Sequence, residues 1–185
     1  MEAIFARTCL ALVLALVISG GSPVQGEESQ SAPLAKQLVT AMAGAGLDAI
    51  AARDPASPDR FIAALVFPDS QLLVVSAPSP SPAALDAYLT QRQYRDVYTA
   101  LQQTSIKEGK LFIQDLGCDG LRPGTDGSVD IMYEHVTAQT IFDGNWKKQG
   151  LTDSAYQARF RDADARYSHM LTALLPVAQS TTRQH

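Results

Sequence analysis

Two adjacent apolar segments joined by a turn constrain the fold of this chain most strongly. Residues 60–67 (RFIAALVF) and 71–77 (QLLVVSA) carry apolar side chains at both odd and even positions. A strand that is apolar on both faces belongs at the centre of a sheet covered on both sides. Between the two segments, Pro68-Asp69-Ser70 has the composition of a tight turn. We therefore predict a central apolar hairpin as the nucleus of the core.

Helical patterns lie on both sides of this hairpin. The spacing of apolar residues predicts helices over 34–53 with a break near residue 45, over 82–103, and over 152–176. Gly44 and Gly46 weaken the first helix at its middle, and Pro55 stops it. Pro82 suits the first position of the second helix, and Pro176 ends or kinks the third.

Three further segments have strand patterns: 110–116, 129–133 and 137–142. In the middle one, Val129, Ile131 and Tyr133 alternate with Asp130, Met132 and Glu134, which is typical of a partly solvated sheet. Helices packed on a mostly antiparallel sheet define an α+β domain. We predict that fold class, with a sheet of about five strands built around the central apolar hairpin.

The first 26 residues have the pattern of an export signal. Arg7 and the amino terminus supply positive charge, residues 9–18 are apolar, and small residues lead to a cleavage site after Gly26. This apolar core is shorter than the roughly 20 residues that span a bilayer. We therefore expect a periplasmic or secreted protein with no membrane insertion after signal cleavage.

The remaining chain reads as one globular unit. We predict a disordered lead-in over 27–33, a single α+β domain over 34–179 and a frayed tail over 180–185. The whole chain has 15 Lys and Arg against 19 Asp and Glu, without a basic block. Nucleic acid is therefore not an expected partner.

The best local candidates for chemistry follow a predicted strand. Asp115, Cys118 and Asp119 lie within five residues, and folding could bring His135 close to them. Cys118 could act as a nucleophile if its thiolate were stabilised. However, the two flanking carboxylates raise the pKa of a thiol. An inert thiol is thus the favoured interpretation, and no catalytic set is assigned.

A cation site in the same region is a weaker hypothesis. Asp115, Asp119, Asp126 and Asp130 supply the oxygen ligands that Ca²⁺ prefers, but the EF-hand spacing is missing. No pair of His or Cys has zinc spacing, and the glycine-rich nucleotide motifs and G-x-S-x-G do not occur. We predict no metal and no cofactor.

The turn Pro58-Asp59-Arg60 and the hairpin that follows, through Ala77, resemble the opening of flavin-binding split-barrel proteins of the pyridoxamine-phosphate-oxidase type. The resemblance implies a basic, hydroxyl-bearing segment next, which holds the flavin phosphate. This chain instead has the rigid connector 78–82 and a predicted helix. The resemblance therefore implies no function for this chain.

Three hypotheses about function remain. The first is a non-enzymatic exported domain that binds a small molecule or a protein of the cell envelope. The second is an enzyme with dispersed catalytic residues near the Asp115–Asp119 loop, and the third is a structural accessory of the envelope. An enzyme predicts a pocket joining Cys118 or Asp119 to His135, whereas a protein-binding domain predicts a large exposed apolar patch.

Overall fold

The computed structural model describes residues 29–79, 81–104, 109–122, 130–135, 138–142 and 146–182. For five of these residues only the backbone is described: His135, Ala138, Trp146, Lys147 and Thr182. The predicted export signal, Asp126 and the end of the predicted tail lie outside the described residues. The structure therefore does not test where the protein is located.

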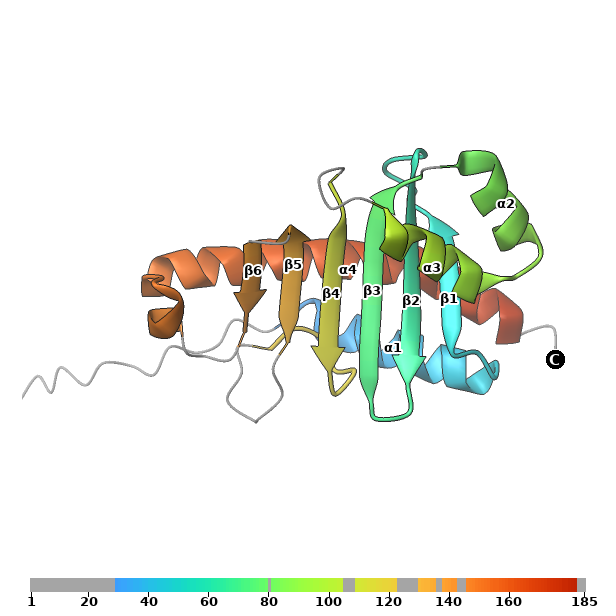
Figure 1. Ribbon diagram of the computed structural model, residues 1–185. Coiled ribbons are helices and arrows are strands. Elements are labelled where there is room, and N and C mark those ends of the chain that lie inside the picture. Colours follow the sequence, from blue (N-terminus) through green and yellow to red (C-terminus); the bar gives the residue numbers. More distant parts are fainter. Residues whose placement is uncertain are drawn as a thin grey trace, which may run out of the picture.

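Six strands form one antiparallel sheet, in the order in which they occur along the chain (Figure 1). The strands are β1 (Ala49–Arg53), β2 (Arg60–Phe67), β3 (Gln71–Pro78), β4 (Leu111–Leu116), β5 (Ile131–His135) and β6 (Ala138–Ile141). The helices are α1 (Ser31–Gly44), α2 (Pro82–Thr90), α3 (Tyr94–Gln103) and α4 (Asp153–Thr182), with a short 3₁₀ helix, η2 (Trp146–Gln149). The predicted α+β class is confirmed, with six strands instead of five.

Helices cover the two faces of the sheet to different extents (Figure 1). One face packs against α1 and α4, and Ile62, Leu72 and Ile113 point into that core. The opposite face packs against α2 and α3, which bury residues such as Phe61 and Val75. The central hairpin β2–β3 is thus buried on both faces, as the sequence predicts. None of the described helices is both long and apolar enough to cross a bilayer.

Residues 49–53 form the edge strand β1, so the predicted helix over 47–53 is wrong. Gly46 adopts φ +65° at the end of α1, where its missing side chain permits the turn. The chain then pairs antiparallel with β2, from Ala49 opposite Leu65 to Arg53 opposite Phe61. Burial against the hairpin therefore outweighs the intrinsic helix propensity of this alanine-rich segment.

The helix predicted over 82–103 is divided into α2 and α3. Arg92 lies between them with φ +57°, a left-handed conformation that a helix does not continue through. The break lets each short helix turn its own apolar side chains to the sheet: Leu85 of α2, and Val97 and Leu101 of α3.

Each terminal helix extends past one of its predicted ends: α1 begins before residue 34, and α4 continues beyond residue 176. α1 begins at Ser31, within the predicted lead-in, because a buried carboxylate of α4 binds its first amides. α4 passes through the exposed Pro176 and extends to Thr182, into the predicted tail. Burial of Leu175 and Ala178 on either side of the proline keeps this last part on the core.

Candidate functional site

Three of the candidate residues predicted from the sequence, Asp115, Cys118 and Asp119, lie at the end of β4 and in the loop that follows it. Asp115 is inside the protein. Asp115 has 0% of its surface exposed. Its carboxylate accepts hydrogen bonds from the Tyr167 hydroxyl (2.9 Å) and from the backbone N–H groups of Gly120 (2.9 Å) and Asp119 (3.2 Å). Burial raises the pKa of Asp115. This carboxylate fastens the loop to α4 and is closed to solvent.

A second buried carboxylate holds the other side of the same loop. Asp130 is also 0% exposed and accepts hydrogen bonds from the N–H groups of Leu116 (2.9 Å) and Arg122 (3.0 Å). Burial, followed by repulsion from Asp115, raises the pKa of Asp130 to about 7. Shifted carboxylates often mark active sites. Since neither carboxylate reaches a solvent-exposed surface, we assign both a structural role.

Cys118 is buried and poorly suited to nucleophilic chemistry. It has φ +56° and lines a cavity of about 270 Å³ together with Lys36, Thr40 and Phe67. Burial and then the charges of Asp115 and Asp119 raise the pKa of its thiol to about 11. The thiol is therefore protonated at neutral pH.

The structure does not bring the remaining loop candidates together as a catalytic set. The Asp119 carboxylate forms an ion pair with Arg122 (2.8 Å). The side chain of His135 lies outside the description, so its distance from Cys118 is not tested. Among the described side chains, no hydrogen bond or ion pair joins a histidine to Cys118 or Asp119. No group of three His, Cys, Asp or Glu in the described part of the chain is placed to hold a metal ion.

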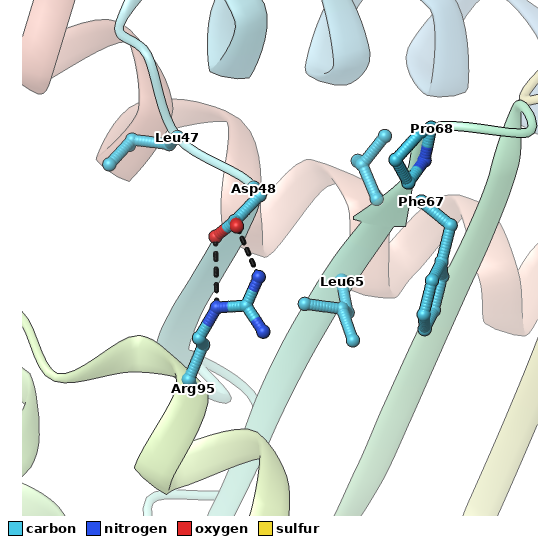
Figure 2. Close-up of a pocket in the computed structure, with 7 residues that line it drawn as sticks. Leu47, Asp48, Leu65, Phe67, Pro68 and Arg95 are labelled. Carbon is cyan, nitrogen blue, oxygen red and sulfur yellow. Dashed lines mark hydrogen bonds and ion pairs between the residues drawn. The ribbon is translucent and has the colours of Figure 1, made fainter.

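A different hollow lies at the carboxyl end of β2. Figure 2 shows its apolar wall of Leu65, Phe67 and Pro68, with the Asp48–Arg95 pair beside it. Its volume is about 310 Å³. Arg95 Nε donates to Asp48 Oδ1 (3.2 Å) and Nη2 donates to Oδ2, which lowers the pKa of Asp48 and raises that of Arg95. These two charges neutralise each other, so the hollow offers an apolar surface and no free charge.

A larger pocket, of about 420 Å³, opens at the other end of β2, between the sheet and α4. We call it the Arg60 pocket. Its apolar wall consists of Leu111, Ala165 and Met170. The other residues that line it are Arg60, Ser76, Gly109, Arg166 and His169.

Local structure places the Arg60 side chain in this pocket. A turn precedes β2, in which the Asp54 N–H donates to the Arg60 carbonyl (2.9 Å) and the Arg60 N–H donates to the Ser57 carbonyl (2.7 Å). Arg60 Nη2 then donates to Ser76 Oγ (3.2 Å) and to the Gly109 carbonyl (2.9 Å). Both acceptors are neutral, so these contacts orient the guanidinium without neutralising it.

The other basic side chains of the pocket have acidic partners. Arg166 pairs with Glu134 and, through Nε, with Asp162 (3.0 Å). His169 Nε2 lies 2.9 Å from Asp54 Oδ1. Among the described residues that line the pocket, Arg60 is thus the one basic side chain without a carboxylate partner.

Sequence reasoning missed this pocket because its residues are dispersed between positions 60 and 170. The one available indication was Arg60, a charged residue at the start of a strand that is apolar on both faces. Helix geometry predicts that His169 faces water, and 45% of its side chain is indeed exposed, but it also lines the pocket. Nothing in the spacing of β2 and α4 residues indicates that they meet.

Comparisons with known proteins give no family for this chain. No protein-family model matches it, and no curated protein or solved structure matches it. Its function must therefore be inferred from its own pockets and surfaces.

Proposed function

We propose that this protein is an exported, non-enzymatic binding protein whose Arg60 pocket holds a small amphipathic carboxylate. The observation that carries the proposal is one un-neutralised arginine at the wall of an otherwise mostly apolar pocket of about 420 Å³. Pockets of this size, apolar with a few convergent polar groups, are typical of small-molecule sites. The predicted export signal supports a role in the cell envelope or outside the cell.

The charges around the pocket favour a monoanion. Both hydrogen bonds that Arg60 donates to Ser76 and Gly109 use Nη2, so Nε and Nη1 keep donors for a ligand. A guanidinium edge of this kind matches the two oxygens of a carboxylate. The carboxylates of Asp54 and Glu134, which bind the neighbouring basic side chains, oppose a second negative charge on the ligand. A carboxylate therefore suits the pocket better than a phosphate dianion.

The apolar wall sets the size of the rest of the ligand. At about 30 Å³ for each water-sized unit, the pocket holds roughly a dozen heavy atoms. Leu111 and Met170 supply apolar contacts, and the unbranched methionine adapts to flexible chains. A saturated carboxylate of about eight carbons has the right size and chemistry.

Binding fits the geometry better than catalysis does. Ser76, His169 and Asp54 are the residue types of a Ser-His-Asp triad, and the first two line this pocket. However, Ser76 Oγ accepts its hydrogen bond from Arg60, and no hydrogen bond between Ser76 and His169 occurs in the described structure. Acyl transfer needs that contact between nucleophile and base.

Calorimetric titration with octanoate tests the proposal. We expect octanoate to bind with a single site and 1-octanol, which lacks the charge, to bind at least tenfold more weakly. Arg60→Gln should weaken octanoate binding at least tenfold, since hydrogen bonds to charged groups contribute about 1.5–3 kcal/mol. Arg159→Gln is the matched control, because Arg159 is exposed on α4 and outside the pocket.

Two results would overturn the proposal. One is absence of octanoate binding, and the other is equal affinity of the wild-type protein for octanoate and octanol. The second comparison needs no variant, so it remains decisive if Arg60→Gln fails to fold. Hydrolysis of p-nitrophenyl octanoate that disappears in Ser76→Ala would instead indicate catalysis in the Arg60 pocket.

A further inference from the structure

Half of one sheet face has no helix over it among the described elements (Figure 1). α3 contacts β1, β2 and β3 on this face. The side chains of β3–β6 that lie beyond α3 are only partly buried or exposed. We call them the open face: Leu73, Phe112, Gln114, Leu116, Ile131, Tyr133, Gln139 and Ile141.

Strand register places the side chains of the open face in two neighbouring rows across β3–β6, mostly apolar with two glutamines among them. Leu73 lies opposite Gln114, Gln114 opposite Ile131, and Ile131 opposite Ile141. In the neighbouring row, Phe112 lies opposite Tyr133, and their rings meet edge to face with centroids 5.7 Å apart. Partly exposed apolar side chains gathered on one surface are typical of interaction sites.

The open face carries no charged side chain among its described residues. Its polar members are amides and the Tyr133 hydroxyl, which Gln139 approaches to 3.4 Å. The chain as a whole has a net charge of −4. Two copies can therefore meet through this face without placing like charges opposite each other.

The shape of the molecule also fits a second copy. α3 adds one layer over β1–β3 and leaves a step down to β4–β6 (Figure 1). A helix and a second sheet each add a layer about 10 Å thick. If two open faces stack about a two-fold axis along the strands, each α3 lies beside the β6 edge of the other copy. The step is thus complementary to itself.

We infer that two copies of this chain associate through the open face as a two-fold symmetric dimer. Three strands about 4.8 Å apart and about five residues long give a contact on the order of 300 Å² per copy. A stable dimer buries about 800 Å² per partner. The α3–β6 contacts enlarge the interface only in part, so the dimer should be weak, with dissociation in the micromolar range.

Sedimentation velocity from about 1 to 200 μM protein tests this inference. The average mass of the wild-type protein should rise toward twice the chain mass. Ile131→Lys should keep the protein monomeric, because the interface would bury two new charges. Gln37→Lys is the matched control, since Gln37 is exposed on α1, away from the open face.

A second variant keeps the test decisive if Ile131→Lys does not fold. Gln139 is exposed, so Gln139→Glu adds charge without disturbing the core, and it should weaken the dimer at least tenfold. A wild-type protein that stays monomeric throughout the range overturns the inference. A dimer that neither variant weakens also overturns it. Octanoate binding does not enter this measurement, so the two proposals fail separately.

Discussion

The two faces of the sheet differ in what they bury. The face under α1 and α4 is closed along its breadth and includes two buried carboxylates, Asp115 and Asp130, that bind loop amides. The face under α3 is closed only over β1–β3 and then becomes an apolar surface. The closed side contains the larger of the two hydrophobic clusters and forms the wall of the Arg60 pocket. The open side is left for association.

Strand β5 shows the contrast within one short segment. Met132 points to the closed side and is buried, whereas Ile131 and Tyr133 point to the open side and are partly exposed. An apolar side chain therefore has a different role on each side of the same strand. Four predictions test this difference, ordered by the change expected for one substitution or for one pH unit.

Matched truncations should separate the two sides most clearly. Ile113→Ala removes a fully buried side chain on the closed side and should lower the free energy of unfolding by about 3 kcal/mol. Ile131→Ala, on the open side, should cost about 1 kcal/mol or less. Urea unfolding of dilute, monomeric protein measures both values. Equal losses would mean that the open face is covered.

The closed side also depends on the carboxylate that starts α1. Asp164 accepts hydrogen bonds from Ser31 Oγ (2.6 Å), the Ser31 N–H (3.1 Å) and the Gln30 N–H (2.7 Å). Asp164→Ala removes the acceptor of these donors, of which the two on Ser31 are buried, and should cost about 2 kcal/mol or more in thermal or urea unfolding. Asp162→Ala, exposed on the same helix, should change stability by less than about 0.5 kcal/mol. A comparable loss in both variants would contradict this role.

Buried Asp130 should make stability depend on pH. Its folded pKa of about 7 lies above the ordinary value of 3.8, so the folded state holds a proton that the unfolded state releases. Stability should therefore fall as pH rises from about 4 to 7, by at most about 1.4 kcal/mol per pH unit, and level off above that range. Asp130→Asn should flatten the decline. Urea midpoints between pH 5 and 8 check this, and identical slopes in both proteins would refute it.

The smallest expected effect is the slow chemical labelling of the Cys118 thiol. With a pKa of about 11, roughly one thiol in a thousand is ionised at pH 8, and the side chain is buried. Iodoacetamide should therefore label the native protein much more slowly than the urea-unfolded protein, as mass spectrometry can follow. Rapid labelling of the native protein would contradict this prediction and show that the thiol is reactive.

The sequence predicts correctly those parts of the fold for which two sequence patterns agree. The hairpin β2–β3 carries apolar residues on both faces and a turn between them, and the structure contains it within one residue. β1 is wrongly predicted because alanine has a strong helix preference but little side chain to reveal burial. The predicted helix end at Pro176 is also wrong, because the packing of Leu175 and Ala178 on the core offsets the free-energy cost of a proline inside the helix.

The candidate site is harder to predict for a physical reason. Asp115 and Asp130 belong to residue types that occur at surface turns, and only the fold shows that they bind amides inside the protein. The alternation around Ile131 correctly indicates a partly solvated sheet. It does not indicate that Met132 is the buried partner. Arg60 and His169 line the same pocket only because α4 packs against β2.

Amide chemical-shift mapping during an octanoate titration compares the two regions in one measurement. We predict shifts at Ser76, Leu111 and residues 165–170, which surround the Arg60 pocket, and little change at Ile131 and Tyr133 on the open face. Shifts confined to the open face, or none at millimolar octanoate, would contradict the assignment of the Arg60 pocket as the ligand site.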